Sequence, residues 1–395
     1  MDPAALIPLS MLLVFASAKL MAEIFERLGQ PGIVGEILAG VLIGPHVLRW
    51  LAPSEFLHTL SDLGVMFLLF RVGLEIKSSE LMKVGGTALL VAVAGILLPF
   101  LMGWGIAALW GEPQLESIFL GAAMVATSVG ITAQVLAARG LLDTRAARTI
   151  LAAAVIDDVL GLLVLALVSG MAKGAVNYLD LAVTAGLSIA FTIFVAYFGT
   201  RTVRRVMPRV QARMQVAEAE FALAMTLLFA LSLLAVYAGV AAIVGAFLAG
   251  MALSETAEGR VSELTHGVAE LLVPFFLVGI GLQFDISAFS NGSTIAFACV
   301  IVLAAVASKF LGCGLGALAI GRTDAVRVGV GMIPRGEVGM VVAQIGVNLG
   351  VIAHNVYGTI VFMSVATTLI APPLLKLAFR AAVVPEAPRD TISET

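Results

Sequence analysis

Two adjacent aspartates, Asp157 and Asp158, lie near the start of an apolar stretch that reads AAAVIDDVLGLLVLALVSG. A carboxylate inside a membrane costs on the order of 3 kcal/mol even on the lenient insertion scale, so it is usually paired or lines a cavity. Neighbouring residues on a helix point about 100° apart. We therefore expect one aspartate to face a fixed countercharge and the other an open cavity. The alternative is that both mark the aqueous end of a helix.

Lys309 is the natural countercharge for one of these aspartates. It lies in VLAAVASKFLGCG, well inside another apolar stretch, and it is the only lysine deep in the second half of the chain. A charged side chain at such a depth is expected to pair with an opposite charge. The alternative is that its ammonium group snorkels to the membrane surface.

Two further segments place polar residues beside helix-breaking ones. MVATSVGIT contains Thr127 and Ser128 close to a glycine, and GMIPRGEVG contains Arg335 and Glu337 around a proline and a glycine. Proline removes a helix donor and glycine loosens the turn. We predict that both segments are discontinuous helices whose ends present partial charges inside the membrane. Arg335 and Glu337 would pair at the break, either as a gating element or as a purely structural pair.

The composition defines the elements that must position these residues. The chain of 395 residues is 60% hydrophobic and 12% charged, whereas soluble domains carry about 25% charged residues. Its apolar runs are long enough to cross a bilayer as helices. We predict an all-α polytopic membrane protein with thirteen transmembrane helices and no soluble regulatory domain. The predicted spans are 5–26, 31–48, 61–76, 84–110, 115–138, 146–171, 178–200, 215–238, 240–254, 262–282, 293–319, 325–347 and 354–379.

The basic residues predict the orientation of these spans. Seventeen of them fall in alternate connections, whereas only Arg49 and Lys173 fall in the others. Lysine and arginine concentrate on the cytoplasmic side of a membrane protein. We therefore expect the N-terminus outside and the C-terminus in the cytoplasm.

An internal repeat is visible at a nearly constant offset. IVGEILAGVLIG at 33–44 aligns with IVGAFLAGMALS at 243–254, an offset of 210. FLLFRVGLEIK aligns with FFLVGIGLQFD at an offset of 208, and SVGIT with EVGMV at 209. Because one span separates the two six-helix units, the second is predicted to be inverted, with the two discontinuous helices crossing, as in many secondary transporters. The alternative is chance similarity among apolar helices rich in glycine and alanine.

The segments ATSVGIT, VIDDV, PRGEVG and GEILAGVLIGP, together with Lys309, resemble the cation:proton antiporter superfamily, in particular the NapA-type bacterial sodium/proton antiporters. The resemblance implies that Asp158 binds the ion and carries the proton, and that Asp157 pairs with Lys309. It also implies that Thr127 and Ser128 lie near the transported Na⁺.

The same resemblance implies that Arg335 and Glu337 sit beside the site, and it implies an architecture. A dimerisation domain and a core transport domain would be joined by a linker helix, and the core would slide past the dimerisation domain like an elevator. The implied segments are 1–82 and 214–289 for dimerisation, 83–172 and 290–380 for the core, 173–213 for the linker, and 381–395 for a cytoplasmic tail.

The resemblance also implies a homodimer in the bacterial inner membrane, in contact with lipid. It would exchange about two protons per sodium ion, because the aspartate pair and the core lysine go with electrogenic exchange in this superfamily. Lithium is a further candidate cargo. No cofactor, enzymatic activity or nucleic-acid partner is expected.

Other functions remain open at the level of sequence. The transported ion could be potassium or a mixture of monovalent cations. A sodium-coupled organic-anion symporter shares this fold, and a channel would conduct without exchange. An intramembrane aspartyl protease is disfavoured, because it needs aspartates on two facing helices, whereas Asp157 and Asp158 are adjacent on one.

Overall fold

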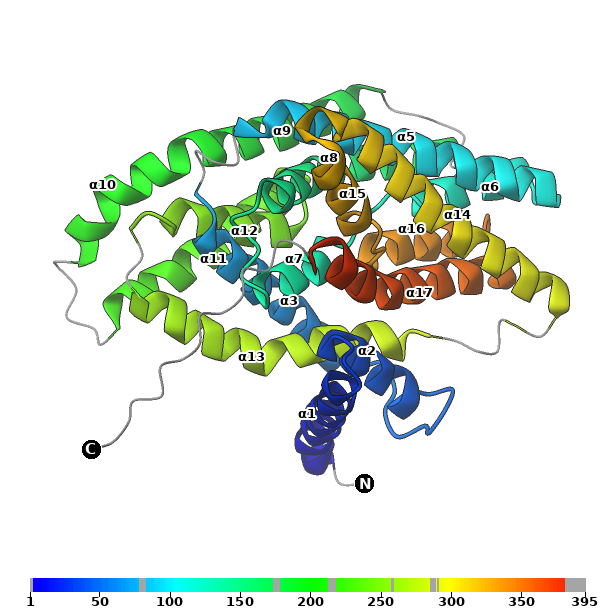
Figure 1. Ribbon diagram of the computed structural model, residues 1–395, viewed down its shortest axis with the longest axis horizontal. Coiled ribbons are helices and arrows are strands. Elements are labelled where there is room, and N and C mark those ends of the chain that lie inside the picture. The colour runs from blue at the N-terminus through cyan, green and yellow to red at the C-terminus, as the bar shows by residue number, and fades with distance from the viewer. Residues whose placement is uncertain are drawn as a thin grey trace.

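The computed structural model describes residues 3–77, 83–172, 178–211, 218–256, 259–284, 289 and 291–380, and every regular element in these ranges is a helix (Figure 1). The α-helices are α1 (Pro3–Arg27), α2 (Gly32–Ile43), α3 (Glu55–Glu75), α5 (Gly85–Trp110), α6 (Gln114–Ala123), α7 (Val129–Ala137), α8 (Arg145–Ala172), α9 (Tyr178–Phe194), α10 (Thr200–Gln211), α11 (Ala219–Tyr237), α12 (Ala242–Leu253), α13 (Gly259–Leu282), α14 (Gly292–Gly316), α15 (Arg322–Gly331), α16 (Glu337–Asn348) and α17 (His354–Ala378). A π-helical turn, η1 (Val195–Gly199), joins α9 to α10, and a 3₁₀ turn, η3 (Leu318–Ile320), precedes α15.

The protein is a polytopic membrane protein. In the described ranges, nine helical segments are long and apolar enough to cross a membrane, namely α1, α3, α5, α8, the segment Ala182–Gly199 of α9 and η1, α11, α13, α14 and α17. Shorter apolar helices lie at Gly32–Ile43, Ala242–Leu253 and Val338–Asn348. Every predicted span overlaps a helix or a broken helix, and the count of thirteen membrane crossings stays a prediction.

Both predicted discontinuous helices are present. The range 115–138 is divided into α6 and α7, and the range 325–347 into α15 and α16. Ser128 is extended, with φ −85° and ψ 98°, directly before α7. Pro334, which has no backbone N–H to donate, lies in the second break, where it cannot continue the hydrogen-bond ladder of α15.

Two helix pairs make unusually close backbone contacts. A Cβ atom on Gly40 of α2 would overlap the Val278 carbonyl of α13, and one on Gly250 of α12 would overlap the Phe70 carbonyl of α3. The alignment of the predicted repeat, at the offset of 210, also pairs Gly40 with Gly250. Helix α2 therefore packs on α13 in the same way as α12 packs on α3.

The candidate site residues lie on a separate group of helices. Helix α8 packs against α5 and α15, and α14 packs against α5, α15 and α17. In Figure 1 the helices α14, α16 and α17 lie together, whereas α1, α2 and α13 run along the lower part of the view. This arrangement places the breaks between α6 and α7 and between α15 and α16 inside the bundle.

Candidate functional site

The two helix breaks contact each other directly. The Ser128 backbone N–H donates to the Pro334 carbonyl at 2.8 Å, and Thr132 Oγ1 donates to the Gly331 carbonyl at 2.7 Å. A Cβ atom on Gly336 would lie 2.6 Å from the Ser128 Cβ, so only glycine fits there. The two extended segments therefore lie side by side in the interior, where their polar backbone groups are shielded from lipid.

Arg335 connects one break to the rest of the bundle. Its side chain is fully buried, and its guanidinium donates to the carbonyls of Met124, Val125 and Ala126 at the end of α6. A further N–H donates to the Ala305 carbonyl of α14 at 3.1 Å. The end of a helix carries a partial negative charge and unpaired carbonyls, so this cation stabilises the interrupted end of α6.

Glu337 is the first residue of α16. Its side chain lies outside the described side chains, so its pairing with Arg335 stays a prediction.

The carbonyl partners of Arg335 were not foreseen from the sequence. The only signal for them was the expected break at Thr127 and Ser128, which implied unpaired carbonyls just upstream.

Asp157 is held by two partners inside the bundle. Lys309 Nζ lies 3.1 Å from its Oδ2 and 3.3 Å from its Oδ1, and Thr127 Oγ1 donates to Oδ2 at 2.6 Å. The side chains of Asp157 and Lys309 are 1% and 0% exposed. Lys309 therefore does not snorkel to a surface, and the fixed countercharge expected for one of the two aspartates is present.

Asp158 points into a different environment. It is partly buried and lines a small, mostly apolar pocket. The other lining residues come from two groups of helices: Val129, Leu151 and Val155 from α7 and α8, and Leu69, Val244 and Phe247 from α3 and α12. Asp158 thus lies at the boundary between the helices that carry the breaks and the helices that pack through the close glycine contacts.

Ser128 contributes an unused polar atom to this region. Its Oγ is buried and has no hydrogen-bond partner among the described residues. Its neighbour Thr127 already bonds to Asp157. Thr127 and Asp157 therefore place two oxygen-bearing side chains in contact beside the break, and such oxygens suit hard cations.

The described ranges contain no group of three or more His, Cys, Asp or Glu side chains that could hold a metal ion. That Asp157, Asp158, Thr127 and Ser128 supply oxygen ligands to a cation stays a prediction. We expected Na⁺ here as a transported ion, and its binding stays a prediction.

One ion-pair network outside the site joins three helices. Lys19 and Glu23 are four residues apart on α1, but Lys19 Nζ lies 3.3 Å from Glu36 Oε1 of α2 and 3.7 Å from Glu270 Oε2 of α13. Glu23 instead pairs with Arg27 at 2.7 Å. The buried Glu36 needs a countercharge more than the exposed Glu23 does, and the packing of α1 on α2 supplies it.

Comparisons with known proteins show which family the chain resembles. Residues 12–381 match the family described as "Sodium/hydrogen exchanger, transmembrane". The chain is 34% identical to the Na(+)/H(+)-K(+) antiporter GerN of Bacillus cereus, over 93% of this chain and 95% of GerN. It is 32% identical to the high-affinity Na(+)/H(+) antiporter NhaS3 of Synechocystis, over 97% of this chain and 92% of NhaS3.

A solved structure shows the same fold. The sodium proton antiporter MjNhaP1 from Methanocaldococcus jannaschii matches 97% of this chain and 98% of its own, with a TM-score of 0.67 at 19% sequence identity. The likeness extends from the first helices to the last, so the similarity concerns the whole arrangement and not one motif.

Proposed function

The chain belongs to the sodium/hydrogen exchanger family, and from that premise we propose that it exchanges sodium ions for protons across the membrane, with about two protons per sodium ion. The observation that carries this proposal is that two adjacent carboxylates have different surroundings. Asp157 is paired with Lys309 inside the bundle, whereas Asp158 lines a pocket between two groups of helices. One carboxylate is thus held in place, and the other is positioned to exchange its occupant.

Asp158 is the proposed binding group for both ions. An ionised carboxylate supplies charge and oxygen ligands to Na⁺, and protonation occupies the same lone pairs. Asp157, Thr127 and Ser128 would complete the oxygen shell, and the unpartnered Ser128 Oγ supports this assignment. Because sodium and proton compete for one carboxylate, binding of one requires release of the other.

The charge balance of the site supports exchange. The three acids Asp157, Asp158 and Glu337 and the two bases Lys309 and Arg335 sum to one negative formal charge. A proton on Asp158 neutralises it while Lys309 keeps its charge, and a sodium ion neutralises it only as long as Lys309 also keeps its proton. Charged groups are costly inside a membrane, so the protonated site would cross more readily than the empty one.

The second proton is proposed to come from Lys309. If sodium draws Asp157 into its oxygen shell, the contact between Asp157 and Lys309 weakens. A buried ammonium that loses its partner is unfavourable, so it would release a proton. Lys309→Gln tests this step: the variant should move no net charge per cycle, whereas continued electrogenic exchange would exclude the lysine as a carrier.

The larger architecture is proposed on the same basis. We propose thirteen spans in two inverted repeats, with a dimerisation domain (1–82 and 214–289), a core domain (83–172 and 290–380) and a linker helix (173–213). The matching glycine contacts of α2 on α13 and α12 on α3 support the repeat. The position of Asp158 between the two domains supports an elevator motion of the core.

The proposal includes a homodimer in the bacterial inner membrane, with the N-terminus outside. The distribution of basic residues supports this orientation. Potassium is a second candidate cargo, since the relative GerN carries potassium as well as sodium in its name. A sodium-coupled organic-anion symporter of the same fold is the alternative outside cation/proton exchange.

Transport by the purified chain in liposomes tests the function. An internal pH dye should report proton movement on addition of Na⁺, compared with Li⁺ and K⁺, with and without a clamped voltage. Asp158→Asn should abolish this flux while the protein still folds. The matched control is Asp143→Asn, because the Asp143 side chain is 89% exposed.

Three outcomes would contradict the proposal. A fully active Asp158→Asn variant would remove the site assignment. A sodium flux that does not move protons would favour the symporter. A flux that is unaffected when the pH gradient is reversed would indicate a channel.

A further inference from the structure

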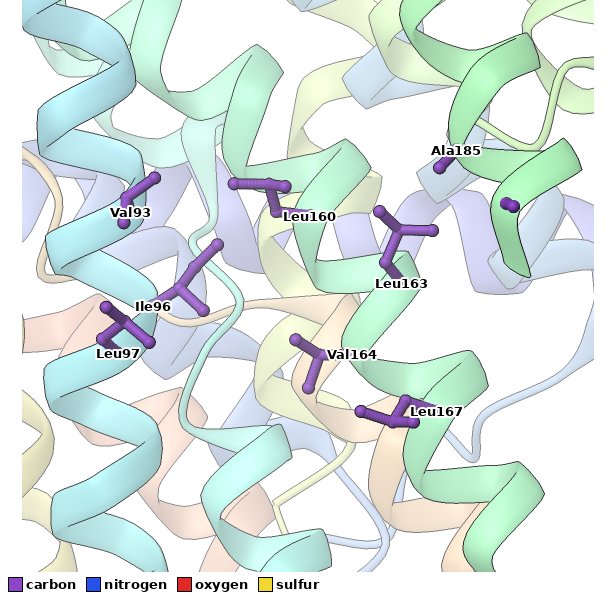
Figure 2. Close-up of a pocket in the computed structure, with 9 residues that line it drawn as sticks. Val93, Ile96, Leu97, Leu160, Leu163, Val164, Leu167 and Ala185 are labelled. Atoms are coloured by element: carbon purple, nitrogen blue, oxygen red, sulfur yellow. The ribbon is translucent and has the colours of Figure 1, made fainter. Parts of the chain in front are cut away.

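A second cavity lies away from the aspartates, between three membrane-spanning helices. It has a volume of about 520 Å³ and is lined by Val93, Ile96 and Leu97 of α5, by Leu160, Leu163, Val164 and Leu167 of α8, and by Ala182 and Ala185 of α9. Figure 2 shows α8 in the middle, with the α5 side chains on one side and Ala185 on the other.

The lining of this cavity excludes a hydrophilic occupant. All nine lining residues are aliphatic. Ligand pockets of about 300–1,000 Å³ normally include a few polar groups that orient the ligand, and a stable internal water also needs polar partners. The cavity is therefore suited in size to a ligand, but its chemistry suits only a hydrocarbon.

The position of the cavity within the helices identifies the hydrocarbon. Leu160 and Leu167 lie twelve and five residues before the end of α8 at Ala172, which corresponds to about 18 Å and 8 Å along the helix. One leaflet of a bilayer has a hydrocarbon thickness of roughly 15 Å. The cavity thus extends along one leaflet, as an acyl chain does.

We propose that this cavity is a binding site for one acyl chain of a membrane phospholipid. Small side chains on α9 create the space: Ala182 and Ala185 line it, and a Cβ atom added to the nearby Gly186 would meet nothing within 4 Å. The chain would lie in an open groove lined by α5, α8 and α9, whereas an annular lipid touches one exposed helix face. The site requires only that these helices span a membrane, so it is independent of the proposed exchange.

Photolabelling of the full chain tests this site. The purified protein is reconstituted in phosphatidylcholine vesicles that contain a phosphatidylcholine with a photoactivatable diazirine in one acyl chain. After irradiation, adducts are mapped by mass spectrometry. We expect labelling of the lining residues that saturates as the fraction of photolipid rises. Labelling of α1, whose Leu12 and Leu20 are 63% exposed, should rise without saturation.

Variants separate a filled cavity from general lipid contact. Ala185→Trp should fill the space and remove the saturable label, and Ala182→Trp should do the same if the first variant folds poorly. Ala190→Trp on the same helix is the control, because Ala190 does not line the cavity; its saturable label should remain.

Three results would overturn the proposal. Labelling of the lining residues that resembles labelling of α1 would mean annular lipid only. A saturable label that persists in both tryptophan variants would place the lipid elsewhere. Adducts between two copies of the chain at these residues would show that protein covers the cavity.

Discussion

Lys309 Nζ lies 3.1 Å from Asp157 Oδ2, although 152 positions separate the two residues along the chain. Helices α14 and α8 bring them together, and neither side chain is exposed to any meaningful extent. The pair is the most deeply buried ion pair in the described part of the chain. Its partner Thr127, at the end of the first helix break, links it to the site.

Removal of one member of this pair should be strongly destabilising. Lys309→Met keeps most of the volume but leaves the Asp157 carboxylate buried without its countercharge, which costs about 3–5 kcal/mol. The double variant Lys309→Met with Asp157→Asn should regain a large part of the loss. Thermal unfolding of the detergent-solubilised protein measures both effects.

The control for this cycle is the surface pair of Arg27 and Glu23, whose side chains are 78% and 59% exposed. Arg27→Gln should change stability by no more than about 1 kcal/mol. If the losses of the Lys309 and Asp157 single variants simply add in the double variant, the two groups are not coupled.

Arg335→Lys should destabilise the protein even though it keeps the positive charge. The guanidinium reaches carbonyls in the break after α6 and on α14, whereas an ammonium is a compact point charge without the planar fork. Each buried carbonyl left without a donor costs about 1–3 kcal/mol. Unfolding by denaturant in mixed micelles would measure the loss, and wild-type stability of the variant would show that charge alone is sufficient.

Gly250→Ala should disturb the packing of α12 on α3. The new methyl group would overlap the Phe70 carbonyl, and overpacking of this kind typically costs about 1–3 kcal/mol. Gly105→Ala on α5 is the matched control, since its Cβ would meet nothing within 4 Å. Because alanine is favoured over glycine in a helix interior, this control substitution should stabilise the protein by about 0.5–1 kcal/mol. Equal melting temperatures for the two variants would contradict the close contact.

Glu112, in the turn between α5 and α6, should make stability depend on pH. Burial raises the pKa of its carboxyl above the ordinary 4.5, and the nearby Glu116 raises it further. The protonated form is therefore favoured by folding. The contribution of Glu112 to folding stability is complete below pH 4.5 and is lost as the pH rises through the raised pKa.

Glu112→Gln removes that dependence. The variant should unfold at a higher temperature than the wild type near neutral pH, and the difference should disappear in acid. Melting curves from about pH 4 to pH 8 would test this. A variant that gains stability equally at both ends of the range would contradict the assignment.

Much of the architecture follows from local properties of the sequence. Helix formation and membrane insertion depend on runs of apolar residues, so each apolar run predicted from the sequence overlaps a helix of the structure. The breaks near Ser128 and Pro334 were also predictable, because proline and glycine act on the backbone within a turn or two. The candidate charges stood out because charge is rare and costly in apolar segments.

The partners of those charges were predictable only in part: Lys309 was expected beside one of the two aspartates, but other partners were not. That Arg335 donates to carbonyls at the end of α6, that Lys19 pairs with Glu36 across two helices, and that a hydrocarbon-lined cavity separates α5 from α9 could be found only in three dimensions. The free-energy cost of placing a side chain in lipid depends on the chemistry of that side chain, so the sequence alone determines it. Which group pairs with a charged side chain depends on how helices distant along the chain pack together, and only the tertiary structure decides that.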